Sequence, residues 1–271
     1  MNTILVTTDF SASSRNTLAY ACGLFGNEAF TILLLHAYAM PVTYTTEGVA
    51  LAAMGDAFIN AEEQLQEEKQ WAVDNFPGVQ VRTKAVVATM MDALRDEIEA
   101  TAPQLILIGA LTDYDDLWTW DNDLLSTLQD LDAPVLVVPG HVTYQPLRNI
   151  GFACDYKNRN AAQIRFIKWL VEYTGARLHV VHITRGNPHD PKARQENEAL
   201  MQELLLEVNP DYHNIEDPHV IPAISGFAKD YNLDLLIVIP HRYGIWDTIF
   251  KQSHTRRLAR LNYLPMLALH D

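Results

Sequence analysis

The stretch ILVTTDFSASSRNTLAYA, residues 4–21, decides the fold. A short apolar run ends at Asp9, and hydroxyl residues of the kind that begin helices follow at once. A second stretch, IGFACDYKNRNAA at 150–162, has the same order: an apolar run, an acid at Asp155 and then a helical pattern. The two acids lie 146 positions apart, so we expect the chain to contain the same kind of domain twice.

Further landmarks recur in the same order. TILLLHAY at 31–38 and RLHVVHIT at 177–184 are apolar runs that reach a histidine, again 146 positions apart. LILIGA at 105–110 matches LLIVIP at 235–240, and APVLVVP at 133–139 matches LPMLALH, both at a spacing of about 130 positions. The first copy is therefore longer in its middle, around 39–56, where we expect a loop and a helix extension.

Each copy alternates apolar strands with helical patterns, which is typical of βαβ units in a doubly wound α/β domain. The strands are continuous apolar runs, as in parallel sheets covered on both faces. We expect five strands in each copy, at 2–8, 30–36, 80–87, 104–109 and 134–138, then at 149–154, 177–183, 210–215, 234–239 and 266–269. The expected helices cover 14–26, 61–76, 90–101 and 123–131, then 157–173, 191–207, 220–231 and 252–262. The expected domains are 1–140 and 141–271, with a linker near 139–148.

Composition restricts the function classes. The 271 residues carry a formal net charge of −14, which disfavours non-specific binding to nucleic acid or to an anionic membrane. The two cysteines, Cys22 and Cys154, form no disulfide framework, which indicates a reducing compartment. The first residues do not have the pattern of a signal peptide, and no run reaches the apolar length of a membrane span. We therefore expect a cytoplasmic protein.

Both acids stand where the first strand of a copy ends. Ligands of doubly wound sheets meet the carboxyl ends of the strands, so Asp9 and Asp155 are candidate ligand contacts. Aspartate also caps helices well, and Ser11 could serve as a cap in the first copy. The sequence leaves both roles open.

These ordered landmarks resemble the universal stress protein family, as two tandem copies. The resemblance implies a strand order of 3-2-1-4-5 and a pseudo-dimer in which the two copies pair through their last strands, with a homodimer as a further option. It also implies a non-enzymatic role in stress response or signalling, with no catalytic residues. Two alternatives stay open: an ATP- or nucleotide-binding protein, even a slow ATPase, and a protein–protein adaptor without a ligand.

ATP binders of that family carry a glycine motif after strand four: Gly, two residues, Gly, nine residues, Gly, then Ser or Thr. Glycines let the backbone approach phosphates closely. In the first copy Gly109 fits the first position, and Thr112 takes the second. In the second copy the three places hold Ile239, Arg242 and Gln252, and only the hydroxyl of Ser253 remains. We therefore expect degenerate nucleotide sites and no tightly bound cofactor.

Charge separates the two loops that carry this motif. The loop 109–131 holds six aspartates and no Lys or Arg, so ATP should not bind the first copy. The loop 239–261 holds five bases against one acid, together with His241 and His254, although its arginines could equally be an exposed helix face. Any retained site should bind a small anion or nucleotide weakly. Its residues would be Asp155, Ile183, His241, Arg242, Ser253 and His254.

The residue after each histidine at the end of the second strand has an implied role. In the resembled family this residue lies beside the adenine, which points to the backbone of Ala37 and Ile183. We expect His36 and His182 themselves to be buried and bonded to the backbone. The acidic loop lacks the glycine and final glutamate of a calcium loop, so no metal is expected. The acidic segment 61–70 is expected to be a solvated helix face.

Overall fold

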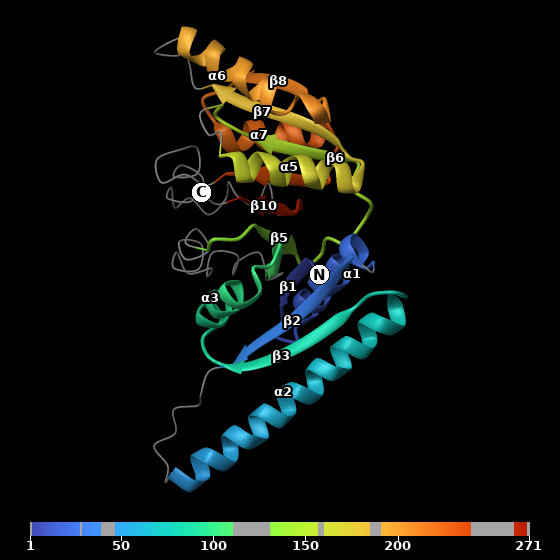
Figure 1. The fold of residues 1–271 in the computed structure, drawn as a ribbon. Coiled ribbons are helices and arrows are strands. Elements are labelled where there is room, and N and C mark those ends of the chain that lie inside the picture. The colour runs from blue at the N-terminus through green and yellow to red at the C-terminus, as the bar shows by residue number, and fades with distance from the viewer. Residues whose placement is uncertain are drawn as a thin grey trace. The chain divides into compact units, whose positions relative to one another are not determined.

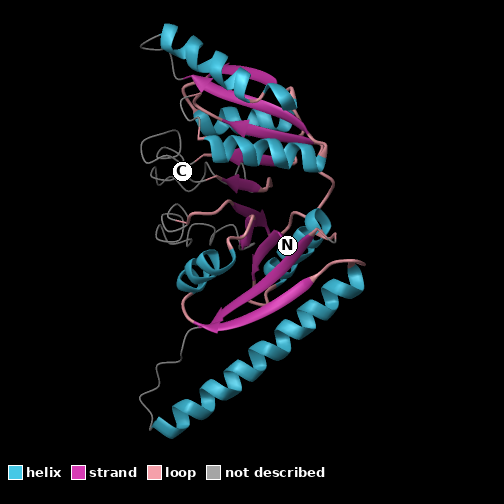
Figure 2. Cartoon of the chain, in the orientation of Figure 1, coloured by secondary structure: helices cyan, strands magenta, loops and turns pink. Residues whose placement is uncertain are grey.

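A computed structural model describes residues 2–27, 29–38, 47–110, 131–156, 160–184, 191–239 and 263–269. The chain divides into two compact units, Met1–Tyr144 and Gln145–Asp271, each built of strands and helices that alternate along the chain (Figure 1). The ribbon coloured by secondary structure shows the same alternation in both units (Figure 2).

Unit 1 contains five parallel strands. The strands are β1 (Asn2–Thr7), β2 (Phe30–Tyr38), β3 (Val81–Val87), β4 (Leu105–Ala110) and β5 (Val135–Pro139), in the sheet order β3-β2-β1-β4-β5. The described helices are α1 (Ala12–Phe25), α2 (Glu47–Asn75) and α3 (Met90–Thr101). Successive residues of a strand face opposite sides of a sheet. Leu5 and Ile106 pack with α3, and their neighbours Ile4 and Leu105 are also buried, so both faces of the sheet are covered.

Unit 2 repeats this arrangement. Its strands are β6 (Asn149–Ala153), β7 (Arg177–Thr184), β8 (Asp211–Glu216), β9 (Leu235–Val238) and β10 (Met266–Ala268), and their order within the unit is β8-β7-β6-β9-β10. The helices are α5 (Ala161–Thr174), α6 (Pro191–Leu204) and α7 (Val220–Asp230), with a 3-10 turn η1 (Leu206–Val208) after α6. In both units the order is therefore 3-2-1-4-5, as expected. The pairing of the units through their last strands stays a prediction.

Most of the expected elements are confirmed, with boundaries that differ by one or two residues. The strand expected at 210–215 is β8, and the helix expected at 90–101 is α3 with the same bounds. The extension of the first copy is also a helix, because α2 spans 29 residues whereas α6 spans 14. The helix expected at 157–173 begins later, at Ala161. The helices expected at 123–131 and 252–262 lie outside the described residues, apart from residue 131.

The segment after β5 packs on α1, which explains why unit 1 continues to Tyr144. The Asn16 side chain donates to the carbonyl oxygens of Pro139 and Val142, at 3.3 and 2.9 Å. The Tyr144 ring meets Tyr20 edge-on at 5.3 Å and lies against Gly23, where an added Cβ would come within 2.2 Å of the ring. More than half of the expected linker, residues 139–144, is thus part of unit 1.

Among the described residues, no helix combines the length and the apolar composition that crossing a bilayer requires.

Candidate functional site

The first strand of unit 1 ends in a corner, which we define as residues Thr8–Ser11. The Thr8 amide still donates to Leu35 of β2, at 2.9 Å. The Thr8 carbonyl, however, accepts from Nδ1 of His36, at 2.8 Å. Phe10 then turns with a left-handed φ of 65° and packs on the His36 ring, at 4.3 Å between centroids. Asp9 therefore lies between Thr8, which is hydrogen-bonded to β2, and Phe10, which packs on the His36 ring.

Unit 2 has the same corner at Cys154–Tyr156. The Cys154 amide donates to Val181 of β7 at 3.0 Å, and Nδ1 of His182 donates to the Cys154 carbonyl at 3.0 Å. Tyr156 has a left-handed φ of 61°, and its ring stacks on His182 at 4.6 Å. Every partner is displaced by 146 positions from its counterpart in unit 1. Non-glycine residues rarely adopt this φ, so its recurrence marks a corner with a defined shape in both units.

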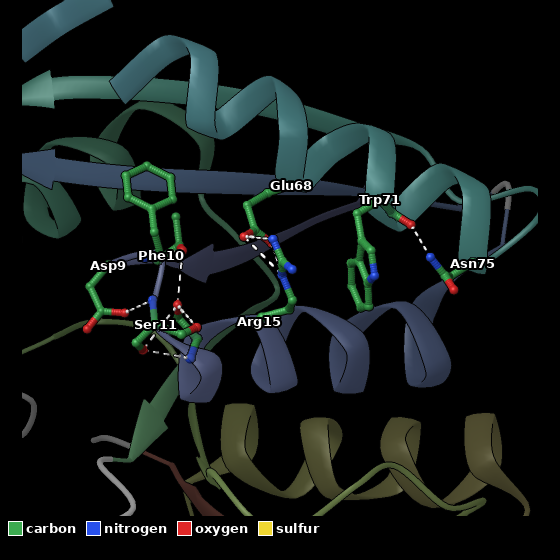
Figure 3. Close-up of polar contacts among 9 residues, drawn as sticks. Asp9, Phe10, Ser11, Arg15, Glu68, Trp71 and Asn75 are labelled. Atoms are coloured by element: carbon green, nitrogen blue, oxygen red, sulfur yellow. Dashed lines mark hydrogen bonds and ion pairs between the residues drawn. The ribbon is translucent and has the colours of Figure 1, made fainter. Parts of the chain in front are cut away.

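The capping role that the sequence left open for Asp9 is wrong. Ser11 is the N-cap of α1, and its hydroxyl accepts from the Ser14 amide at 3.2 Å. Asp9 instead closes a tight turn, because its Oδ1 accepts from the Ser11 amide at 3.0 Å (Figure 3). Partial desolvation raises the pKa of Asp9, but hydrogen bonds from Ser11 and Ser14 outweigh it, so that its pKa lies below the ordinary value. The carboxylate is therefore ionised at neutral pH, and it is exposed.

Asp155 is not a helix cap either. The N-cap of α5 is Asn160, whose side chain accepts from the Ala162 amide at 2.9 Å. Asp155 lies five residues earlier, directly before the left-handed Tyr156, and is half-buried. The sequence could not separate the two roles because a short polar side chain near a helix start suits both.

The two histidines fix strand-one carbonyls, which confirms the expected bonds to the backbone. Both are half-buried rather than fully buried. Burial lowers the pKa of His182, and its bond to the Cys154 carbonyl only partly offsets this effect. His182 is therefore neutral at neutral pH, and Nδ1 carries the proton because it faces a carbonyl.

The residues that follow the two histidines, Ala37 and Ile183, have backbone N–H and C=O groups that lie beside the corners. In a parallel ladder, residues two apart point their N–H and C=O groups to the same side. Since Leu35 faces β1 and Val181 faces β6, Ala37 and Ile183 face those sides too, beyond the last ladder bond. Within the described chain, no backbone hydrogen bond joins the Ala37 amide to Thr8 in unit 1. The same holds in unit 2 for the Ile183 amide and Cys154, the residue equivalent to Thr8. The Ile183 side chain, by contrast, is buried against α7.

Gly109 lies near the end of β4, and helix packing explains its lack of a side chain. An added Cβ would come within 2.8 Å of Thr17 Oγ1 and 3.2 Å of the Ser13 carbonyl oxygen, both in α1. The glycine thus lets α1 approach the sheet, whether or not a phosphate ever lies nearby.

The corner of unit 2 joins a polar network that reaches β8 and α6. Asn214 of β8 is paired in register with His182, and its Oδ1 accepts from the Tyr156 hydroxyl and from Arg194 of α6, both at 3.4 Å. Its Nδ2 donates to Glu198 at 3.0 Å. The amide orientation is fixed, because a flipped amide would turn its donors toward Arg194 and its oxygen toward a carboxylate. Burial raises the pKa of Tyr156, so the hydroxyl stays a donor.

Unit 1 has an ion pair near its corner that is not expected from the sequence. Glu68 was expected on a solvated face, but its side chain is 5% exposed and accepts from Arg15 of α1, at 2.6 Å (Figure 3). The Arg15 guanidinium also lies over the Trp71 ring, at 5.4 Å. Ala61, Leu65 and Glu68 share one buried side of α2, a helical spacing that could have identified this position.

Several candidate residues cannot be placed. His241, Arg242, Ser253 and His254, and most of the acidic loop 109–131, lie outside the described residues. Within the described ranges, no cluster of three or more His, Cys, Asp or Glu side chains is suited to a metal ion. Burial raises the pKa of Cys154 to about 12, so its thiol is protonated at neutral pH and a poor nucleophile.

Three solved structures are similar to the chain to different degrees. A universal stress protein from Archaeoglobus fulgidus superposes with a TM-score of 0.70 at 17% identity, covering 99% of this chain and 96% of its own. A functionally unknown protein from Pseudomonas aeruginosa gives 0.57 at 17% identity, covering 100% and 92%. A universal stress protein family protein from Arabidopsis thaliana with AMP bound gives 0.37 at 14% identity, covering 51% and 92%, and a likeness at that score says nothing about ligands of the present chain.

Sequence comparison places the first unit directly. No curated protein sequence matches the chain significantly. Residues 1–111, which include the first corner, Ala37 and Gly109, match the universal stress protein family. Residues 1–111 of the chain therefore carry a universal stress protein domain, and the second unit repeats its fold.

Proposed function

We propose that the chain is a non-enzymatic stress-response protein whose second unit binds a nucleoside or nucleotide weakly at its corner. One observation carries the proposal. In each unit, a histidine side chain occupies the carbonyl that follows the first strand, so this carbonyl does not pair with the backbone of the residue after the histidine, Ala37 or Ile183. The N–H and C=O groups of that residue therefore lie beside an aspartate without this ladder bond. Such N–H and C=O groups can pair with the edge of a purine, and a carboxylate can accept from ribose hydroxyls.

The phosphate end of the site supports weak rather than tight binding. The lack of a side chain at Gly109 is explained by its close contact with α1. The sequence places no glycine at the motif positions of the second loop. Without backbone amides around the phosphates, a nucleotide keeps mainly its base and sugar contacts. We favour unit 2 because the six aspartates of the first loop would repel a phosphate. His241, Arg242, Ser253 and His254 remain candidates for the phosphate side.

The test compares the two acids in the full chain. Calorimetry with adenosine should detect binding to the wild type, and Asp155→Asn should weaken it about tenfold, since a hydrogen bond to a charged group contributes about 1.5 kcal/mol or more. Asp9→Asn, the matched change in unit 1, should leave the affinity unchanged. Equal loss in both variants would refute the assignment to unit 2, and no binding of adenosine would refute the nucleoside site.

The adaptor function is the second candidate. Phe58 and Ile59 are exposed on α2, 44% and 56% respectively, as large apolar side chains at a binding surface would be. A chain that binds no adenosine but captures a partner through α2 would favour this function. We also propose a cytoplasmic location, because the two buried cysteines are free and a reducing compartment keeps them so.

A further inference from the structure

We propose that Arg194 recognises an anionic group on the ligand of unit 2, and this inference rests on the proposed nucleoside site. Arg194 lies in the first turn of α6, and α6 follows β7 after a short connection. That connection begins at the carboxyl end of β7, the end at which Asp155 and Ile183 also lie. Arg194 is not among the residues expected from the sequence, because the expected basic residues all lie in the loop 239–261.

The contacts of Arg194 place it next to the corner. Its guanidinium and the Tyr156 hydroxyl donate to the same atom, Oδ1 of Asn214, each at 3.4 Å. The Tyr156 ring in turn stacks on His182. Burial is the largest cause of the pKa shifts of both Tyr156 and His182, and Arg194 acts to lower both pKa values while Glu198 acts to raise them. The charge of Arg194 therefore reaches both side chains of the corner.

The guanidinium has donors to spare. Arginine carries five N–H donors, and the Asn214 amide is a neutral acceptor at a long distance. Across the described ranges, no carboxylate lies within ion-pair distance of Arg194, although the chain has 34 acids against 20 bases. Glu198, one turn further along α6, accepts from Nδ2 of Asn214 instead. A phosphoryl group could therefore replace a weak neutral contact by a bidentate, charge-assisted one.

Unit 1 lacks this arrangement. The residue paired with His36 is Ala85, which has no polar side chain, and the corner ring is Phe10, which has no hydroxyl. Arg15 of α1 already forms an ion pair with the buried carboxylate of Glu68. The difference favours anion recognition by unit 2, for a reason that does not depend on the loops 109–131 and 239–261.

The experiment measures adenosine and AMP by calorimetry with the full chain. The wild type should bind AMP about tenfold more tightly than adenosine, the effect of one charge-assisted contact. Arg194→Gln should bring AMP to the affinity of adenosine and leave adenosine itself unchanged. Arg165→Gln, which removes the same charge from an exposed position of α5, should keep the wild-type ratio.

The outcomes separate this inference from the nucleoside site. If adenosine binds and Arg194→Gln keeps the preference for AMP, the inference is wrong while the site stands. Equal affinity of the wild type for both ligands would also overturn it. If neither adenosine nor AMP binds, both proposals fall. Inorganic phosphate should displace AMP but not adenosine, and Arg194→Lys should keep part of the preference, because it retains the charge without the planar fork.

Discussion

The two corners share a backbone but differ in the side chains around it. Each has an amide bonded to the second strand, a carbonyl bonded to an imidazole, an acid, and an aromatic residue with a left-handed φ. In unit 1 the corner hydroxyls bond to Ser14 of α1, and Arg15 of the same helix pairs with Glu68, whereas in unit 2 the corner tyrosine joins the network of Asn214 with Arg194. The corner is therefore a structural device that two units keep, and its surroundings decide whether it can receive a ligand.

The largest expected effect concerns the Arg15–Glu68 ion pair of unit 1. Arg15→Ala leaves the buried Glu68 carboxylate without its partner, which should lower the free energy of unfolding by about 3 kcal/mol. Unit 2 carries Ala161 at the corresponding position, so it has no such dependence. Urea unfolding measures the change, and hydrogen exchange should show faster opening of α2.

The control uses another ion pair of unit 1. Arg95 faces Asp92 at 3.7 Å, and both side chains are exposed, so Arg95→Ala should cost no more than about 0.5 kcal/mol. Similar losses in the two variants would mean that the buried position of Glu68 contributes nothing. The double variant Arg15→Leu, Glu68→Leu should regain stability over Arg15→Ala, because no charge is left buried.

A smaller loss is expected from Gly109→Ala. The new methyl group would press on Thr17 and on the Ser13 carbonyl, which should cost about 2 kcal/mol. Thr17→Ala removes the nearer atom, so the double variant should lie closer to Thr17→Ala than an additive loss would give. At the aligned place unit 2 carries a buried Ile239. A Gly109→Ala variant of unchanged stability would show that packing does not require this glycine.

Much of the fold could be predicted because the chain repeats its landmarks. The offset of 146 between Asp9 and Asp155 also holds for His36 and His182, so both corners could be located from the sequence. Strand bounds agree closely because continuous apolar runs end where the buried sheet ends. The role of each acid could not be predicted, since the choice of Ser11 and Asn160 as caps depends on local dihedral angles.

The contacts around the corners were beyond the sequence for another reason. The network of unit 2 joins Tyr156 of the corner, Arg194 of α6 and Asn214 of β8. No regular sequence spacing relates these three residues. Its members meet because β7 and β8 pair in one particular register. The burial of Glu68 could have been found from the spacing of α2, but its partner Arg15 lies 53 residues away.

Acid should affect unit 2 before unit 1. Burial is the first cause that lowers the pKa values of His179, His182 and His213, so the native state holds these rings neutral. An unfolded histidine takes up a proton near pH 6.5, so the unfolded chain binds more protons below that pH. Stability is therefore present above about pH 6.5 and falls on acidification, by at most about 1.4 kcal/mol per pH unit for each histidine.

Hydrogen exchange at pH 7.5 and 5.5, corrected for intrinsic rates, separates the two units. Protection of β6, β7 and β8 should fall more on acidification than protection of β1 and β2. His182→Gln should reduce this loss, because the amide can still donate to the Cys154 carbonyl without titrating. His219→Gln is the matched control, because the side chain of His219 is exposed. Equal acid sensitivity of both units would contradict the expectation.

The smallest expected effect comes from Tyr156→Phe, which gives the corner of unit 2 the ring of unit 1. The hydroxyl bond to Asn214 is long, at 3.4 Å, so its loss should lower the free energy of unfolding by about 0.5 kcal/mol. The ring still stacks on His182, and Arg194 still donates to Asn214. Affinity for AMP should therefore change less than twofold, as the anion is recognised by the guanidinium and not by the phenol. Phe10→Tyr is the reciprocal control, and it should create no anion preference, because Ala85 offers the new hydroxyl no acceptor side chain. A tenfold loss of AMP affinity in Tyr156→Phe, with adenosine unaffected, would instead place the recognition of the anion on the tyrosine hydroxyl.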